Sequence, residues 1–275
     1  SDSIKDQTMA VLKRFSKVFS KNSLDIGDTV ETKVKLNFDD QKCVKEPERD
    51  FGHEKTKHLV RLVNDLVTAD VVEPYDGLEP RAISNAVMIQ KNAGRTKAEK
   101  FLKRMSSEVD KPIWRMTIDA RKLNKALVNM PQTSVPIIDH VLQKVSGKIV
   151  SQMDLCQAFF SIRVTEDTKP YLCFWCDGKL YTFKRLIQGL KSSPAIFIMT
   201  ANGAFSTEKL REIEQSAPKD IAEVLKESDS FDDFLQVYVD DLFIYSSSET
   251  DHVAHLYAVL AAVKDSGLKI SPKKC

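Results

Sequence analysis

Two adjacent aspartates, Asp240 and Asp241, lie between apolar, strand-forming runs in the stretch QVYVDDLFIYS, residues 236–246. Two carboxylates about 4 Å apart repel each other by roughly 4 kcal/mol at an effective dielectric near 20. A protein tolerates this in a turn that is fully solvated or that has a cation beside it. An Asp-Asp turn also suits the common two-residue hairpin poorly, since that hairpin favours glycine or asparagine at positive φ. From this stretch alone, a solvated turn and a metal site are equally open.

A third carboxylate, Asp154, ends the apolar run of residues 148–153 and begins DLCQAFFSI, where a helical turn is expected. A strand-end aspartate beside a hairpin-turn pair can supply the all-oxygen ligand set that Mg²⁺ prefers, completed by water and phosphate oxygens. Two such ions activate an attacking oxygen and stabilise a leaving one in phosphoryl transfer. Taken alone, Asp154 is equally explained as a helix N-cap.

Composition places the chain among globular proteins. Its 275 residues are 42% hydrophobic, enough to bury the core of one large domain or two small ones. No stretch approaches the roughly 20 apolar residues of a membrane span, and the N-terminus lacks a signal-peptide centre, so we expect no membrane partner and an intracellular site. Five cysteines, an odd and scattered set, argue against a disulfide framework. Cys173 and Cys176 fall on one strand of a hairpin expected at Asp177-Gly178, where an offset of three puts the two thiols on opposite faces. With no second pair nearby, buried thiols are favoured over zinc ligands or a redox pair.

Charge is distributed unevenly along the chain. The net charge is +2, but residues 91–115 carry eight basic and three acidic side chains, so this segment is +5 and the rest is −3. A local positive lobe suits a partner made of phosphates. Taken alone, the segment is better explained by a solvated helix with surface lysines.

Hydrophobic periodicity predicts alternating helices and strands. Helices are expected in the first twenty residues and at 54–67, 94–111, 193–205 and 251–264, the last ending at Gly267. Strands are expected at 86–90, 114–119, 148–155, 234–239 and 242–246, with a hairpin at Asp177-Gly178. This order favours an antiparallel sheet with helices on one face. The dense charges of residues 208–233 predict a surface insertion.

Five blocks of sequence share one family resemblance. They are WRMTIDARKLNKAL (114–127), SQMDLCQAFFSIRV (151–164), FKRLIQGLKSSPAIF (183–197), VYVDDLFIYS (237–246) and DHVAHLYAVL followed by GLKISPKKC (251–275). In this order they make residues 54–275 resemble the reverse transcriptases of retroviruses and of long-terminal-repeat retrotransposons, particularly the gypsy type. Ile187 departs from a usual proline and Ala120 from a usual aromatic residue, but neither change removes a ligand.

The resemblance implies an α+β fold, the right-hand polymerase fingers and palm, with helices backing an antiparallel palm sheet. It implies an N-terminal helix and extended segment at 1–50, fingers at 51–135 with a basic insertion at about 92–112, and a palm at 136–275. Within the palm, about 160–190 returns to the fingers and about 206–233 is the surface insertion. Because the sequence stops at Cys275, before the primer-gripping hairpin, thumb and ribonuclease H of the family, we expect an excised fragment with the thumb absent.

The resemblance also implies roles for individual residues. Asp154, Asp240 and Asp241 match the catalytic carboxylates, and these three with Leu155 match the metal ligands. Nucleotide-binding positions are Lys91, Arg115, Phe159, Gln188 and Gly189, and template or primer contacts are Arg121, Tyr238 and Val239.

Several of these positions have a plain structural alternative. A ring at Phe159 should collide with a ribose 2′-hydroxyl and so select deoxynucleotides, or it is a core phenylalanine, as is expected of Phe160. Asp119, Arg121 and Asn124 resemble template-contact and fingers positions, or Asp119 and Arg121 form a salt bridge. His252 and His255 are expected on a helix surface rather than at a metal.

The function implied is RNA-directed DNA polymerase, with two Mg²⁺ ions (Mn²⁺ as a substitute) and with dNTPs, an RNA or DNA template and its primer as partners. The remaining thumb and ribonuclease H regions of a polyprotein are further expected partners, and a cytoplasmic virus-like particle is the expected location. Two alternatives stay open, an RNA-dependent RNA polymerase and a non-catalytic nucleic-acid-binding or assembly module. Phe159 argues against the RNA polymerase, and the presence of all three carboxylates argues against the non-catalytic module.

Overall fold

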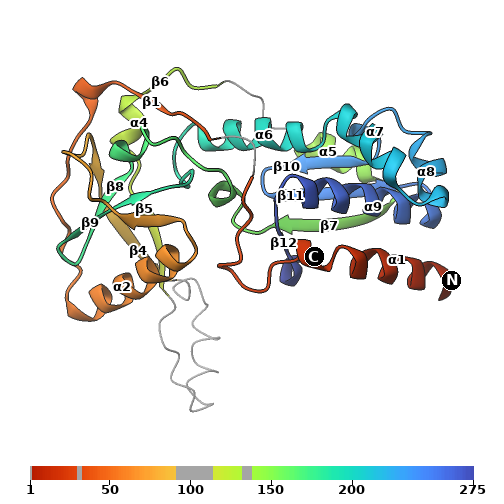
Figure 1. The fold of residues 1–275 in the computed structure, drawn as a ribbon, viewed down its shortest axis with the longest axis horizontal. Coiled ribbons are helices and arrows are strands. Elements are labelled where there is room, and N and C mark those ends of the chain that lie inside the picture. Colours follow the sequence, from red (N-terminus) through yellow and green to blue (C-terminus); the bar gives the residue numbers. More distant parts are fainter. Residues whose placement is uncertain (1, 30–32, 91–113, 132–137) are drawn as a thin grey trace, which may run out of the picture. The chain divides into compact units, whose positions relative to one another are not determined.

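The computed structural model describes residues 2–29, 33–90, 114–131 and 138–275, and Figure 1 shows its course. Lys91, the basic insertion at 92–112 and the helix expected at 94–111 lie outside the described residues. The chain forms two compact units. Unit 1 comprises Ser1–Val34, Asn129–Val164 and Lys191–Cys275, and unit 2 comprises Lys35–Val128 and Thr165–Leu190. Within the described residues, no helix is both long and apolar enough to cross a membrane.

The centre of unit 1 is a four-stranded sheet in which every neighbouring pair is antiparallel. Its order is β10 (Leu235–Tyr238), β11 (Asp241–Ser246), β7 (Ile149–Leu155) and β12 (Ile270–Ser271). The predicted strands at 148–155, 234–239 and 242–246 are confirmed to within a residue or two. The predicted antiparallel sheet is confirmed as well.

Helix α9 (Glu249–Asp265) packs against β11 and forms the middle of the unit 1 core. Ten of its residues are buried, including the unbroken run from Leu256 to Val263. A helix that is apolar on all sides must be covered on all sides. Here β11 covers one face, and α1 (Asp2–Arg14), α7 (Thr207–Ser216) and α8 (Lys219–Leu225) cover others.

Residues 206–233 are part of this core, which differs from the surface insertion that their charge density predicts. Ser206 caps α7 by accepting a hydrogen bond from the Lys209 N–H. The segment then buries the apolar residues of its successive helical elements, which are Leu210, Ile213, Ile221, Leu225 and Phe231. The apolar residues recur at helical spacing between charged residues that face solvent, so the many charges conceal the buried face in the sequence.

The remaining described elements of unit 1 are short or flank the sheet. They are α5 (Ile138–Val145), α6 (Ser193–Ala204) and the 3-10 turns η1 (Ser16–Val18), η3 (Ala158–Ser161), η5 (Phe231–Asp233) and η6 (Pro272–Lys274). The helix predicted at 193–205 is therefore confirmed as α6. The helical turn expected after Asp154 is present as η3.

Unit 2 contains a second four-stranded sheet of order β2 (Val72–Pro74), β9 (Lys179–Phe183), β8 (Cys173–Cys176) and β3 (Ile83–Ser84). Strands β4 (Ala86–Gln90) and β5 (Trp114–Ile118) form a separate antiparallel pair, as do β1 (Asn37–Phe38) and β6 (Leu127–Val128). The other described elements are α2 (His53–Thr68), α4 (Leu123–Ala126), η2 (Asp40–Lys42) and η4 (Lys169–Tyr171).

The β8–β9 hairpin turns at Asp177 and Gly178, as the sequence predicts. Both residues have positive φ, 52° and 69°, which is the pattern of a type I′ turn. The thiols of Cys173 and Cys176 are free and buried. Burial raises the pKa of Cys173 to about 12 and that of Cys176 to about 11, so both thiols stay protonated and pack as small apolar groups.

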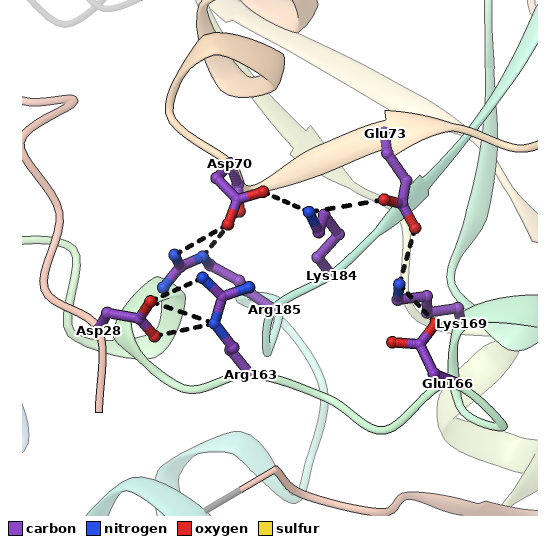
Figure 2. A network of polar contacts seen from close by, with 8 residues as sticks. All are labelled: Asp28, Asp70, Glu73, Arg163, Glu166, Lys169, Lys184 and Arg185. Carbon is purple, nitrogen blue, oxygen red and sulfur yellow. Dashed lines mark hydrogen bonds and ion pairs between the residues drawn. The ribbon is translucent and has the colours of Figure 1, made fainter. Parts of the chain in front are cut away.

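A network of ion pairs in unit 2 fastens the end of β9 to the start of β2 (Figure 2). Lys184 bonds to Asp70 and lies 3.5 Å from Glu73, which is also 2.8 Å from Lys169. The buried side chain of Arg185 donates from Nε to the main-chain oxygen of Asp70 at 2.8 Å. These bonds hold the chain rigidly just before residues 186–190, where the nucleotide-binding positions Gln188 and Gly189 are expected.

Candidate active site

The β10–β11 hairpin turns at Val239 and Asp240, because Tyr238 pairs with Asp241. Asp241 is therefore the first residue of β11 and not part of an Asp-Asp turn. Positive φ falls on Val239, at 52°, and this is the first turn position, where type II′ hairpins prefer glycine. A β-branched residue in this region is strained, and such strain accumulates at functional sites.

Register explains why Asp241 leaves the core. Leu242 and Ile244 are fully buried, and side chains alternate between faces along a strand, so Asp241 and Phe243 point to the opposite face. Asp241 pairs directly with Asp154 of β7, which places both carboxylates on that same face. The Leu155 N–H donates to the main-chain oxygen of Asp240 at 2.8 Å, so the turn is tied to the same end of β7. Asp154 is thus brought beside Asp240 and Asp241, from which it is distant in sequence, at one end of the paired strands.

Each of these carboxylates has a different environment. Asp154 Oδ1 accepts a hydrogen bond from the Lys274 ammonium at 2.8 Å. Asp241 Oδ1 accepts one from Gln152 Nε2 at 3.1 Å. Asp240 Oδ1 is buried and has no hydrogen-bond partner among the described residues. A buried acceptor without a donor is costly, so this oxygen is suited to a ligand.

Electrostatics at Asp240 agree with this arrangement. Its pKa is raised, chiefly by burial and further by the charges of Asp154 and Asp241, while Lys274 partly offsets the effect. Two negative neighbours and loss of water both disfavour the ionised form. A divalent cation beside Asp240 would remove this penalty.

The donor chemistry fits a hard cation such as Mg²⁺, since all the available groups are oxygens. However, no three Asp, Glu, His or Cys side chains in the described parts of the chain are gathered so that they could hold a metal ion together. Asp154 is instead engaged by Lys274. Asp154, Asp240 and Asp241 are therefore candidate ligands whose side chains would have to move closer together around a metal ion.

The expected nucleotide-binding residues of unit 2 are held by polar contacts. Arg115 Nη2 donates to Gln188 Oε1 at 2.9 Å, and Asn124 Nδ2 donates to the Gly189 carbonyl at 2.8 Å. Gly189 has φ of +96°, a conformation that side chains rarely adopt. These bonds join β5 and α4 to the 188–189 segment, so Arg115 and Gln188 act as one assembly.

The salt bridge expected as the alternative role of Arg121 is present. Arg121 donates from Nε and Nη2 to the two oxygens of Asp119, at 2.8 and 2.6 Å. This pairing lowers the pKa of Asp119 to about 2. The Arg121 side chain is 86% exposed, so the salt bridge leaves its outer face open to a further partner.

Phe159 is half-buried in η3 and meets Phe197 edge to face, with ring centroids 5.9 Å apart. Its position is compatible with both a packing role and an exposed ring edge. Phe160, which is expected in the core, is half-buried as well. Tyr238 and Val239 are half-buried at the hairpin.

His252 and His255 do not lie on an open helix surface, which corrects the sequence-based expectation. Both imidazoles are half-buried and share the Ser246 hydroxyl, at 2.9 and 2.8 Å from their Nδ1 atoms. Burial of the α9 face that meets β11 accounts for this. His252 Nε2 also bonds to Ser151 Oγ at 2.8 Å.

Sequence reasoning assigned no role to Gln152 or Lys274, which contact the aspartates. Gln152 stands two residues before Asp154 in β7, so the period of the strand could have placed it on the same face. Lys274 lies in the block GLKISPKKC, but its contact depends on the pairing of β12 with β7. No local signal reveals that pairing.

The family described as "Reverse transcriptase (RNA-dependent DNA polymerase)" matches residues 103–275. The chain is 26% identical over 270 residues to Polyprotein P3 of Commelina yellow mottle virus, covering 94% of this chain and 12% of that one. It is 24% identical to the Enzymatic polyprotein of Figwort mosaic virus (94% and 33% covered) and 24% identical to the Retrovirus-related Pol polyprotein from transposon gypsy of Drosophila melanogaster (99% and 26% covered). The chain thus spans a third or less of these polyproteins.

Solved structures share the fold. The crystal structure of the native Prototype Foamy Virus Protease-Reverse Transcriptase matches with a TM-score of 0.70 at 19% identity, over 98% of this chain and 30% of that one. The foamy viral protease-reverse transcriptase in complex with RNA/DNA hybrid matches with a TM-score of 0.68 at 18% identity, over 100% and 31%. At this identity the likeness establishes the fold, which agrees with the predicted fingers and palm.

Proposed function

Because the chain belongs to the reverse transcriptase (RNA-dependent DNA polymerase) family, we propose that it is the fingers and palm part of an RNA-directed DNA polymerase. The primer 3′-hydroxyl would attack the α-phosphate of a dNTP, forming a new P–O bond while pyrophosphate leaves. One observation carries the proposal. The register of β7 and β11 places Asp154 opposite Asp241, and the turn residue Asp240 is bonded to the same end of β7.

The proposed ligands of Mg²⁺, with Mn²⁺ as a substitute, are the carboxylates of Asp154 and Asp240 and the main-chain oxygen of Leu155. Asp241 would share or tune the site. The unpartnered Oδ1 of Asp240 and the raised pKa of its carboxyl support this assignment. Two bound ions would activate the attacking oxygen and stabilise the leaving one. The carboxylates also hold negative charge where phosphates arrive, so they require this compensation before a nucleotide can bind.

Arg115, Gln188 and Gly189 are proposed to contact the incoming nucleotide, together with Lys91 and Phe159. The bond from Arg115 to Gln188 orients the guanidinium and uses one of its five donors, and the others suit a phosphate. Arg121, Tyr238 and Val239 are proposed contacts of the template and primer, and the exposed Arg121 guanidinium suits a phosphate partner.

The decisive experiment is primer extension on an RNA template with Asp240→Asn, made in the longer protein that includes the downstream regions. Asparagine keeps the shape of the side chain but removes its charge. We expect extension to fall at least about a thousandfold, equivalent to about 4 kcal/mol of transition-state stabilisation. Asp229→Asn, a change of the same type at an exposed position, should extend normally. Wild-type-like extension by Asp240→Asn would refute the assignment.

A non-catalytic role in binding nucleic acid is the second candidate, favoured by one observation. No three of the described carboxylates are close enough together to hold a metal ion, and Asp154 forms an ion pair with Lys274. Titration of Mg²⁺ into the wild type and Asp154→Ala by calorimetry separates the two functions. A catalytic site should lose affinity in the variant, whereas a binding module should show no carboxylate-dependent heat.

A further inference from the structure

The contact between Lys274 and Asp154 is built into the sheet. Lys274 ends η6, which directly follows β12, and β12 pairs with β7 so that Ser271 lies opposite Asp154. Lys274 therefore follows Ser271, the residue opposite Asp154, by three positions, and the strand pairing holds its main chain close to Asp154. Its ammonium lies 2.8 Å from Asp154 Oδ1.

The two partners differ in how far they are removed from water. The Asp154 side chain is 15% exposed, whereas the Lys274 side chain is 65% exposed. A carboxylate in such surroundings needs a counter-charge, particularly with Asp241 directly across the sheet. An exposed ammonium, in contrast, can return to water at little cost. The ion pair thus compensates Asp154 without holding Lys274 irreversibly.

We propose that Lys274 is a tethered counter-ion, which neutralises Asp154 while no divalent ion is bound and is displaced when one binds. This inference rests on the proposed function, since it takes Asp154 to be a metal ligand. The Lys274 ammonium and a divalent cation bound to Asp154 repel each other and compete for Oδ1, so binding of one disfavours the other. Lys274 therefore stabilises the ion-free protein and lowers its affinity for metal.

The test is calorimetric titration of Mg²⁺, and separately of Mn²⁺, into the chain without nucleotide or nucleic acid. Lys274→Met removes the ammonium but keeps the length of the side chain. We expect it to bind either ion about tenfold more tightly than the wild type, a difference of about 1.4 kcal/mol. Lys274→Arg should bind like the wild type. The matched control is Lys273→Met, which removes the same charge from the same exposed turn and should change affinity less than about twofold.

Thermal unfolding provides a second readout that does not depend on activity. In EDTA, Lys274→Met should unfold at a lower temperature than Lys273→Met, and saturating Mg²⁺ should abolish the difference. Lys274→Gln serves in place of Lys274→Met if the latter does not fold.

Equal metal affinity of Lys274→Met and Lys273→Met would overturn the inference. Asp240→Asn in the same titration separates this result from failure of the proposed function. If the wild type binds and Asp240→Asn does not, the metal site stands whatever Lys274 does. If the wild type binds neither ion, the metal site and the inference are both overturned.

Discussion

Asp154 of β7 and Asp241 of β11 are direct cross-strand partners, with their carboxylates on the same face of the sheet. Like charges placed directly opposite each other destabilise a sheet. The fold nevertheless adds Asp240 to the pair and leaves its Oδ1 without a partner among the described residues. The three carboxylates therefore repel one another in the absence of a divalent cation. Binding of such an ion would remove this repulsion and stabilise the folded protein.

Asp241→Asn should stabilise the ion-free protein. Asparagine keeps the oxygen that accepts from Gln152 and removes the repulsion with Asp154. We expect the free energy of unfolding in EDTA to rise by up to about 1 kcal/mol, measured by urea denaturation. Saturating Mg²⁺ should stabilise the wild type more than the variant. Glu223→Gln, at an exposed position of α8, is the control, and a less stable Asp241→Asn in EDTA would contradict the argument.

Val239→Gly should relieve the strain of the hairpin turn. Left-handed backbone costs a residue with a β-carbon about 1–2 kcal/mol. Glycine avoids this cost, but its larger conformational entropy in the unfolded chain offsets part of the gain. We expect a net stabilisation of about 0.5–1 kcal/mol by urea denaturation. Val237→Gly, at a regular position of β10, should destabilise the protein instead. If both glycine variants are destabilised equally, the turn at Val239 is not strained.

Local signals predicted much of the sheet. The apolar, strand-forming runs on either side of Asp240 and Asp241 are visible in the sequence, and so is the Asp177-Gly178 turn, because both depend on residues close together in the chain. The position of the β10–β11 turn could not be predicted from neighbouring residues. Asp-Asp resembles a turn, but burial of Leu242 fixes the register and moves positive φ onto Val239.

Contacts between distant residues could not be predicted from local patterns. Lys274 reaches Asp154 only because β12 pairs with β7, and the two segments are more than a hundred residues apart. Similarly, the apolar stripe at Leu210 and Ile213 has a partner only once α9 is in place. The site residues could be predicted from the family resemblance, whereas the residues that contact their charges are known only from the tertiary structure.

Phe159→Ala should relax discrimination between sugars if the ring lies beneath the nucleotide sugar. Removal of the ring would open space for a 2′-hydroxyl, so we expect the preference for dNTPs over ribonucleotides to fall at least about tenfold. Single-nucleotide primer extension in the longer protein measures both efficiencies. Phe160→Ala, the adjacent half-buried ring, is the control. An unchanged preference in Phe159→Ala would leave this ring a packing role against Phe197.

His255 should make the protein sensitive to mild acid. Its imidazole stacks on Phe234, with ring centroids 4.1 Å apart and planes at 3°, and burial is the main cause that lowers its pKa to about 4. Because the folded pKa lies below the ordinary value of about 6.5, the unfolded chain binds more protons between these two values. Stability from neutral His255 is therefore complete above pH 6.5 and is lost as the pH falls towards 4.

The expected loss is about 3 kcal/mol over the whole window, of which about 2 kcal/mol falls between pH 7 and pH 5, measured as the free energy of unfolding in urea at pH 7, 6 and 5. His255→Gln cannot take up a proton there, so its stability should depend less on pH, although it should be less stable at pH 7 through lost stacking on Phe234. His53→Gln, at an exposed position that begins α2, should keep the wild-type dependence. Identical slopes for the wild type and His255→Gln would show that another group accounts for the acid sensitivity, for example His252 of α9, whose pKa is also lowered by burial.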